Sequence, residues 1–223
     1  MTYPDILAAL ARERVNTFLS EQQARRQASP ARAARSSARG KRAVLRDGST
    51  VLMRPVRGTD APMLVGGFAR LSPQSRWMWF LGTKTSLSAA ELRYLTNVDH
   101  YDHEALSALS AADRRGVGIA RYVRDTNDPR SAEIAVIIVD DWQGRGLGTE
   151  LLARLSDRAR QAGIDRFTAL VSTQNAVMAG LRGKLGGCLV GRGPGTVDYE
   201  VALVIPPADP GYDQMPQLVS QPC

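Results

Sequence analysis

The chain has 223 residues, of which 43% are hydrophobic and 23% are charged, a composition typical of one globular domain with terminal extensions. No apolar run approaches the ~20 residues that a membrane-spanning helix requires, and the N-terminus lacks the basic and apolar segments of a secretory signal. The two cysteines and two histidines are too few for a disulfide framework or a cysteine-rich zinc site. We therefore expect a cytoplasmic protein that binds no metal and has no membrane partner.

The net charge of +7 is concentrated near the N-terminus. Residues 1–42 hold nine Lys or Arg and three Asp or Glu, whereas the other 181 residues hold 20 basic and 19 acidic groups. A basic arm suits an acidic partner, nucleic acid or a membrane surface. Its arginines are not interleaved with aromatic residues, as they are in many nucleic-acid-binding segments. A solvated extension is therefore favoured, and nucleic acid is not an expected partner.

Four segments are predicted along the chain. Residues 1–27 have the periodicity of an amphipathic helix, and residues 28–47 read as a basic linker rich in Ala, Arg and Ser. Residues 48–205 alternate between strand and helix signals and form the predicted folded domain. Residues 206–223 are rich in Pro and polar residues and are expected to be a flexible tail.

Within the predicted domain, apolar periodicity and turn signals place the elements in chain order. The pattern Ser88-x-x-Glu91 is a capping box, which marks the start of one helix. The expected elements are a strand over 50–57, three helices starting near residues 60, 73 and 89, strands over 104–112, 117–124 and 132–139, a helix over 147–162, a strand over 166–172, a helix from Asn175 to Gly186 and a strand over 197–205.

A glycine-rich loop separates the strand over 132–139 from the long helix that follows it. The loop reads Gln143-Gly-Arg-Gly-Leu-Gly148. Glycines allow a tight turn and leave backbone N–H groups uncovered, and the start of a helix adds unpaired N–H donors. Such a loop is either a cradle for a phosphate or pyrophosphate, or a plain turn. It does not fit the dinucleotide fingerprint, because Thr149 occupies the third glycine position, and the chain has no Gly-Lys-Ser/Thr of a P-loop.

The loop matches Gln/Arg-x-x-Gly-x-Gly/Ala and resembles the acyl-CoA pyrophosphate loop of the GNAT superfamily of N-acyltransferases. The likeness is strongest to bacterial Pat-type protein-lysine acetyltransferases. It implies an α/β (α+β) fold with a mixed, mostly antiparallel sheet of about six to seven strands, flanked by helices and splayed between its central strands. The residues that carry the likeness are Leu52, Arg54, Pro55, Val56, Asp60, Arg70-Leu71-Ser72, Asp102-His103, Ala105-Leu106, Ala132–Ala135 and Val139–Gly146.

The resemblance assigns roles in binding acetyl-CoA, the implied co-substrate. The strand before the loop exposes backbone groups to the pantetheine arm through Ile137, Ile138 and Val139. The loop holds the pyrophosphate through backbone N–H groups. Its residues are Gln143, Gly144, Arg145, Gly146, Leu147, Gly148 and Thr149. Asn175 matches the family asparagine that lies beside the pantetheine. Asn175 could equally be a simple N-cap of the helix that follows it.

The resemblance also assigns the chemistry. Glu133 matches the glutamate that acts as general base in Pat-type enzymes, and the other reading is a glutamate on the polar face of its strand. Many family members carry a proton-donating Tyr seven residues after the asparagine, but here that position is Arg182, which contacts the cofactor and stabilises a thiolate only electrostatically. His103 either lines the acceptor site or makes a structural hydrogen bond. Three aromatic residues either wall the acceptor groove or belong to the core under the second helix, and they are Trp77, Trp79 and Phe80.

Three functions remain open from the sequence. The first is an acetyl-CoA-dependent N-acetyltransferase that modifies a protein lysine, on an acyl-CoA synthetase, by direct attack of the amine on the thioester. The second is an acetyltransferase for a small amine. The third is a non-catalytic acyl-CoA-binding regulatory module, which the departure at Arg182 keeps open. Either a monomer or a homodimer is compatible with each.

Overall fold

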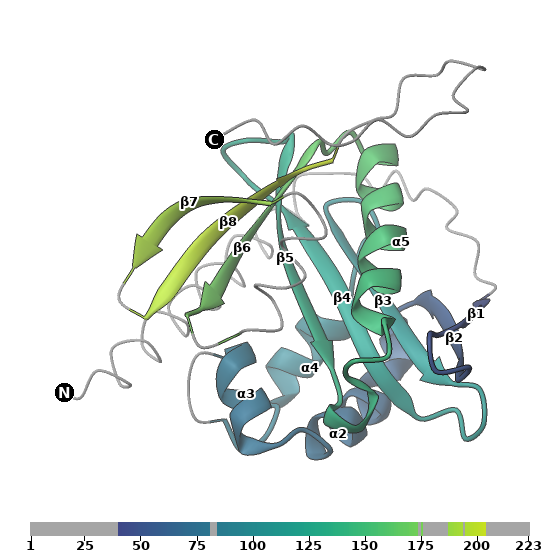
Figure 1. Cartoon of the computed structure of the whole chain (residues 1–223). Helices are drawn as coiled ribbons and strands as arrows, with labels where there is room; N and C mark the ends of the chain where they lie inside the picture. Colours follow the sequence, from purple (N-terminus) through teal and green to yellow (C-terminus); the bar gives the residue numbers. More distant parts are fainter. Residues whose placement is uncertain (1–39, 81–83, 174, 176–186, 194, 204–223) are drawn as a thin grey trace.

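The computed structural model describes residues 40–80, 84–173, 175, 187–193 and 195–203 (Figure 1). Eight strands in these residues form one mixed sheet in the order β1-β2-β3-β4-β5-β6-β8-β7. Every neighbouring pair is antiparallel except β5 and β6. The strands are β1 (Lys41–Val44), β2 (Thr50–Pro55), β3 (His103–Ser110), β4 (Gly116–Arg124), β5 (Ser131–Ile138), β6 (Arg166–Ser172), β7 (Cys188–Gly193) and β8 (Thr196–Ala202).

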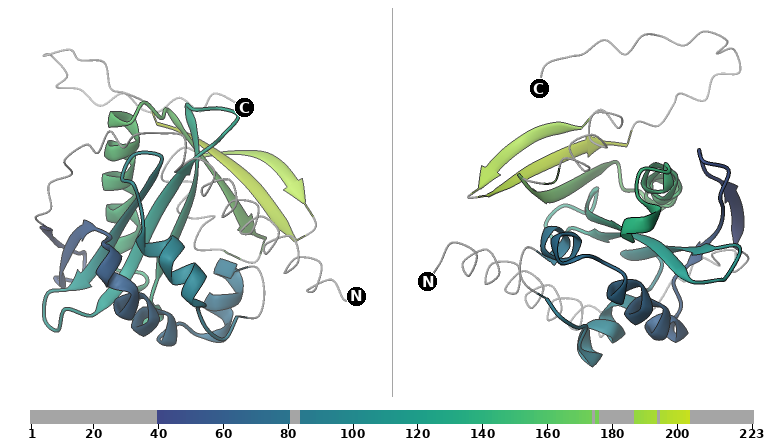
Figure 2. Two further views of the ribbon diagram at one scale, coloured as in Figure 1. Left: turned by 180° about the vertical axis from the view of Figure 1, so that it is seen from behind. Right: turned by 60° about the horizontal axis from the view of Figure 1, so that its bottom comes forward.

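Helices cover both faces of this sheet (Figures 1 and 2). The long helix α5 packs on one face, and α2, α3 and α4 lie on the other. The helical segments are η1 (Gly58–Asp60), α2 (Ala61–Ala69), α3 (Pro73–Phe80), α4 (Ala89–Thr96), η2 (Asp140–Trp142) and α5 (Leu147–Gln161). The predicted mixed sheet with flanking helices is therefore confirmed. No helix in the described part of the chain has both the length and the hydrophobicity that crossing a membrane requires.

The number of strands exceeds the predicted six to seven, because two edge strands carry weak sequence signals. β1 falls inside the predicted linker 28–47, so that prediction was wrong for Lys41–Val44. This strand pairs only with β2, is largely exposed and starts with two charged residues, which hides any alternation of buried and exposed positions. β7 contains two glycines, which lower strand propensity.

Several predictions lie outside the described residues. They are the helix over 1–27, most of the linker, the tail over 206–223 and the helix predicted from Asn175 to Gly186, which includes Arg182. The capping box at α4 does form: the Ser88 N–H donates to Glu91 Oε2 at 2.8 Å, and the Glu91 N–H donates to Ser88 Oγ at 3.2 Å.

The centre of the sheet opens between β5 and β6. Their parallel ladder has only three pairs, from Ser131 opposite Arg166 to Glu133 opposite Thr168, whereas β4 and β5 form seven. The two strands then diverge toward their carboxyl ends (Figure 1). Consistent with this divergence, residues Ala135–Ile138 of β5 are only partly buried. The predicted splay between central strands is confirmed.

Helix α5 closes the other face of the opened strand. Its buried side chains repeat at helical spacing, as the sequence predicts, and they are Leu147, Leu151, Leu152, Leu155 and Ala159. The helix approaches β4 closely because position 118 is glycine. A Cβ there would lie 2.7 Å from Ile138 Cδ1 and 3.2 Å from Leu147 Cδ2. This contact fixes the start of α5 against the end of β5.

Candidate active site

The turn between β5 and α5 presents backbone donors at the end of the opened strand. Gly144 and Gly146 adopt left-handed conformations, with φ of 75° and 89°, and Gly146 is the N-cap of α5. The first backbone hydrogen bond of the helix runs from the Glu150 N–H to the Gly146 carbonyl at 3.1 Å. N–H groups before Glu150 have no acceptor within the helix, so this turn has the geometry of an anion cradle.

Asp140 ties this turn to the helices on the opposite face. Its carboxylate accepts hydrogen bonds from the Ser72 N–H at 2.6 Å, the Ser75 hydroxyl and Gln143 Nε2 at 3.0 Å. Arg70 Nη2 donates to both carboxylate oxygens of the neighbouring Asp141, at 3.0 Å to Oδ1 and 2.8 Å to Oδ2. The predicted signature stretches around Arg70 and Asp140 therefore meet in space, where they join the start of α3 to η2.

Hydrogen bonds also set the charge of Asp140. Burial alone would raise the pKa of this carboxyl group, but the bonds from Ser75 and Ser72, together with the nearby positive charge of Arg76, lower it below its usual value. Asp140 is thus an anion under neutral conditions, and it stabilises the fold through its bonded donors.

Two predicted cradle side chains are used within the turn itself. Gln143 Nε2 donates to the Ile138 carbonyl at 3.1 Å. Arg145 pairs with Asp47 at 2.9 Å, donates to the Asp141 carbonyl and lies over the Trp142 ring, 4.8 Å from its centre. Because these side chains stabilise the shape of the loop, the backbone N–H groups are the donors that remain available to bind a ligand.

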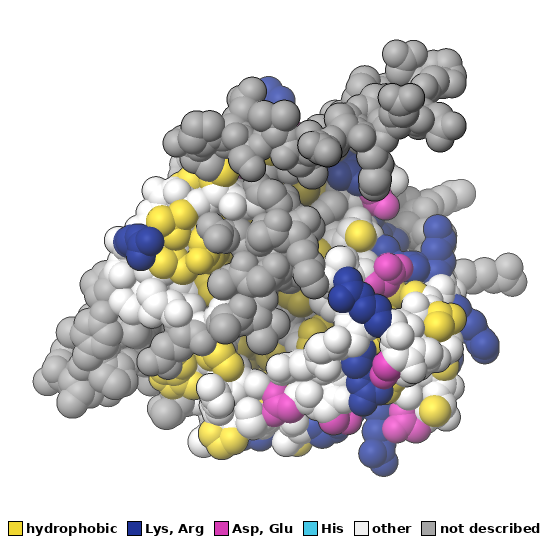
Figure 3. All heavy atoms as spheres, in the orientation of Figure 1, with side chains coloured by type: hydrophobic (Ala, Val, Ile, Leu, Met, Phe, Trp, Pro, Cys, Tyr) yellow, Lys and Arg dark blue, Asp and Glu magenta, His cyan; other side chains and the backbone are white. Residues whose placement is uncertain are grey.

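The sequence missed Arg46, which comes from the turn between β1 and β2. Its exposed side chain lies beside the cradle, with Nε 3.3 Å from the position that a Cβ of Gly146 would take. Its backbone N–H donates to the Arg145 carbonyl at 3.2 Å. Basic side chains gather over α5 and the turn before it (Figure 3). No sequence pattern indicated this position, because Arg46 belongs to a segment that reads as linker.

The three predicted pantetheine residues end the opened strand. Ile137 pairs with Ile119 of β4 and faces the helices α2 to α4, whereas Ile138 faces α5 near Gly118. Both are partly buried, and Val139 is 4% exposed, with its N–H donating to the Val117 carbonyl at 3.1 Å. The strand edge beyond Glu133 is not paired with β6, which is the geometry that the pantetheine prediction requires.

Glu133 lies where the splay begins. It is paired with Val123 on one side and with Thr168 on the other, and its side chain is exposed. It is close to Tyr94 of α4: burial raises the pKa of the Tyr94 hydroxyl, and the negative charge of Glu133 raises it further. An exposed carboxylate at this position is accessible to an incoming amine.

His103 is buried behind other side chains, with 2% of its surface exposed. Its ring stacks on Tyr94 at 5.0 Å between centres, and its Nε2 lies 3.3 Å from Arg121 Nη1. Arg121, which the sequence did not single out, reaches the nearby pocket and also donates to the Leu95 carbonyl at 3.2 Å. The Asn175 N–H donates to the carbonyl of Ser172, the last residue of β6, at 2.9 Å.

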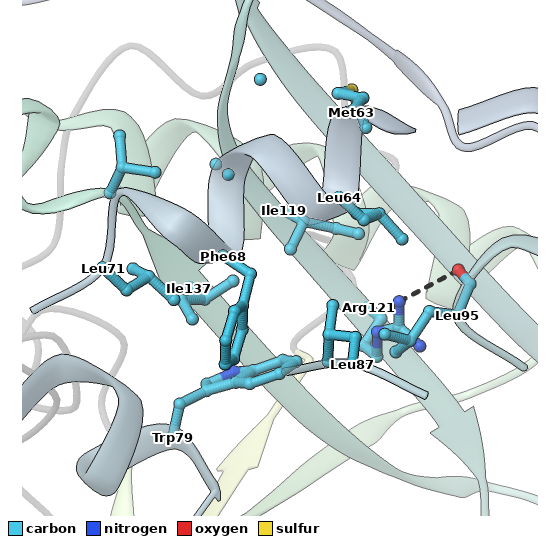
Figure 4. Close-up of a pocket in the computed structure, with 14 residues that line it drawn as sticks. Met63, Leu64, Phe68, Leu71, Trp79, Leu87, Leu95, Ile119, Arg121 and Ile137 are labelled. Atoms are coloured by element: carbon cyan, nitrogen blue, oxygen red, sulfur yellow. Dashed lines mark hydrogen bonds between the residues drawn. The ribbon is translucent and has the colours of Figure 1, made fainter. Parts of the chain in front are cut away.

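An apolar pocket lies between the sheet and the helices α2 to α4 (Figure 4). Its volume is about 60 Å³. Trp79 lies across one side of it below Phe68, and Arg121 and Leu95 lie at the other end. Trp79 thus lines a pocket, in line with the wall that the sequence offered as one reading. The remaining lining residues are Met63, Leu64, Gly67, Leu71, Leu87, Gly116, Gly118, Ile119, Ile137 and Val139.

A sheet that opens along one strand and ends in a backbone anion cradle defines an acyl-CoA-binding N-acyltransferase. Residues 50–187 match the family model described as Acetyltransferase (GNAT) domain, and the chain belongs to this family. The described domain is therefore an acetyltransferase domain of the GNAT type, a family whose co-substrate is acetyl-CoA.

Relatives and solved structures agree with the family. Acetyltransferase Pat of Mycolicibacterium smegmatis is 32% identical over 74% of this chain and 49% of its own length, so the chain spans about half of that relative. Acetyltransferase PA5475 of Pseudomonas aeruginosa is 38% identical over 64% of this chain and 77% of its own length. The GNAT domain of S. lividans PAT has a TM-score of 0.69 and 30% identity over 73% of this chain and 96% of that domain.

The hydrogen bonds that Asp140 accepts predict a free energy of unfolding that depends on pH. Replacing Asp140 with Ala leaves the donors of Ser72 and Ser75 without their acceptor and should destabilise the protein by roughly 1–3 kcal/mol at neutral pH. Because the folded pKa of Asp140 is lowered, this contribution is full above the unfolded value of about 3.9 and is lost as pH falls through the folded pKa. Urea unfolding at several pH values should show the wild-type advantage shrinking in acid.

Asp141 is the matched control for this measurement. Its side chain is 59% exposed, so Asp141→Ala should cost only about 0–1 kcal/mol. Equal losses in the two variants would contradict the role given to Asp140.

The cradle predicts that a carboxylate at position 146 excludes CoA. Gly146→Glu places negative charge where the pyrophosphate binds and should weaken CoA binding by about a hundredfold or more in calorimetry. Gly163→Glu is the control, since Gly163 has a similar φ of 79° at the other end of α5. Both changes strain the backbone, but only the first should alter CoA affinity. Unchanged affinity in Gly146→Glu would show that the cradle lies elsewhere.

Proposed function

We propose that this acetyltransferase modifies a lysine side chain of a protein, and that its acceptor is an acyl-CoA synthetase. The similarity to Acetyltransferase Pat and to the GNAT domain of S. lividans PAT supports this reading. So does the set of Pat-like residues around Arg70 and Asp140, which the fold joins into one contact. The cytoplasmic location, and a monomeric or homodimeric state, belong to the same proposal.

The observation that carries the proposal is the position of Glu133 at the start of the splay, upstream of the unpaired edge of β5. In the proposed arrangement the backbone of Ile137, Ile138 and Val139 binds the pantetheine arm, and the turn from Gln143 to Thr149 binds the pyrophosphate. The thioester is then held on the opened strand between the cradle and Glu133. Much of the rate enhancement comes from this positioning.

The reaction is a direct transfer. Glu133 accepts a proton from the acceptor ammonium, and the neutral amine attacks the thioester carbonyl carbon. The new C–N bond forms as the C–S bond breaks, CoA leaves as a thiolate, and the newly bonded nitrogen releases its extra proton to solvent to give the neutral amide. Arg182 lies at the position of the family's proton-donating Tyr but cannot usefully donate a proton. We therefore assign protonation of the thiolate to water, which a thiol pKa of about 8.5 permits.

The test offers the purified protein acetyl-CoA together with an acyl-CoA synthetase and, separately, a pool of small amines. A mass increase of one acetyl group on a synthetase lysine is the expected result. Acetylation confined to a small amine would overturn the protein acceptor and keep the transferase. Binding of acetyl-CoA without any modified acceptor would overturn catalysis itself.

The Glu133→Gln variant tests the base. It should bind acetyl-CoA as the wild type does but lower kcat by roughly 100-fold or more, with the larger effect at low pH, where the amine is protonated. Asp157→Asn, an exposed change on α5, serves as the control and should leave kcat unchanged. Equal turnover in Glu133→Gln and the wild type would remove Glu133 from this role.

A further inference from the structure

Arg121 is a buried cation that forms no ion pair with a carboxylate among the described residues. It is 5% exposed on β4, and none of the ion pairs among the described residues includes it. Burial lowers the pKa of its guanidinium group, and the Tyr94 hydroxyl offsets this only in part. A buried charge is costly unless an opposite charge compensates it. The pocket beside Arg121 is therefore short of one negative charge.

The same pocket is short of hydrogen-bond acceptors. Arg121 uses Nη1 and Nη2 on His103 and the Leu95 carbonyl, but its Nε has no partner. Trp79 Nε1, on the opposite wall, also lacks one. Within the described residues, the only other buried side-chain atom without a partner is Arg76 Nε, on the same helix as Trp79. The two unpartnered atoms that belong to pocket-lining residues, Arg121 Nε and Trp79 Nε1, are both donors, so a ligand that satisfies them supplies acceptor oxygens.

These properties exclude a lysine ammonium as the occupant. An ammonium brings a second positive charge and only donors, and it would leave every unpartnered N–H unsatisfied. The rest of the lining is almost wholly apolar. The pocket thus fits a short chain of methylene groups that ends in an oxygen acceptor, and a carboxylate fits best because it also neutralises Arg121.

The pocket is continuous with the proposed track of the acyl donor. Ile137 and Val139, which end the opened strand, also line the pocket. Ile119 pairs with Ile137, and Arg121 pairs with Ala135, so Arg121 lies two residues farther along the sheet, on the order of 7 Å away. A short chain on a thioester held beside Ile137 extends along β4 toward Arg121. This continuity favours the acyl group over the acceptor as the occupant.

We propose that the pocket binds the acyl group of the donor, and that Arg121 lets the site accept short dicarboxylic acyl groups, such as succinyl, in addition to acetyl. The inference rests on the proposed binding of acyl-CoA along β5. The transfer step is unchanged: the amine attacks the thioester carbonyl, the C–S bond breaks and Glu133 takes the proton. The far carboxylate remains ionised beside Arg121 and takes no part in bond making. Trp79 closes the pocket around the methylene groups.

The test measures binding and so does not depend on the acceptor. Dethia analogues of acetyl-, butyryl- and succinyl-CoA, in which CH2 replaces sulfur, are titrated into the full chain by calorimetry. Butyryl matches succinyl in chain length without the charge. The succinyl analogue should bind about tenfold or more tightly than the butyryl analogue, as expected for a charge-assisted hydrogen bond, and Arg121→Met should abolish that preference.

A second variant tests the pocket assignment independently, in case Arg121→Met does not fold. Leu87 is partly buried at the pocket wall, and Leu87→Phe should fill the pocket, weakening the butyryl and succinyl analogues while leaving the acetyl analogue bound as in the wild type. Loss of the longer chains in this variant, with acetyl binding kept, would support the pocket assignment on its own.

Three results would overturn the inference. The first is equal affinity of the succinyl and butyryl analogues for the wild type. The second is a succinyl preference that survives in Arg121→Met. The third is Arg121-dependent binding of a free amino acid to the complex with CoA, which would assign the pocket to the acceptor. In the first two cases the acetyl analogue still binds and the proposed function stands, whereas the third would also count against a protein acceptor. Failure of every analogue to bind would remove the proposed function as well.

Discussion

The short parallel ladder between β5 and β6 is the constraint on which the rest of the structure depends. Only three residue pairs join these strands, and α5 connects the end of β5 to the start of β6 across one face of the sheet. Past Glu133 the edge of β5 is therefore left without a strand partner. Three features are arranged along this unpaired part of β5. The cradle lies at its end, the proposed base lies at its start, and the pocket lies on the face that α2 to α4 cover.

Helix α3 connects the cradle to the pocket. Asp140 binds the Ser72 N–H and the Ser75 hydroxyl at the start of α3, and the same helix carries Trp79 into the pocket wall. One carboxylate and its hydrogen bonds thus join the cradle turn to the helix that carries Trp79.

On the sheet face that α2 to α4 cover, the positive charge of Arg121 and the negative charge of Glu133 lie at different depths below the surface. Arg121 is buried, and Glu133 is exposed two residue pairs farther along the same two strands. An amine that approaches Glu133 therefore meets a carboxylate at the surface, whereas the cation stays behind the pocket wall with His103 and Tyr94. In the proposed mechanism, this separation allows one face to accept a proton and to hold an acyl carboxylate without the two groups pairing.

The sequence by itself determined the elements whose signal is local. Backbone freedom indicates the glycines of the cradle, and a short polar motif indicates the capping box at Ser88. The spacing of apolar residues indicates helix α5 and the order along the chain of the six inner strands. Only the tertiary structure decided the edge strands and the buried charge. β1 becomes a strand because β2 offers its edge, and Arg121 is a buried cation because α4 and β3 close over it, and neither effect leaves a mark in neighbouring residues.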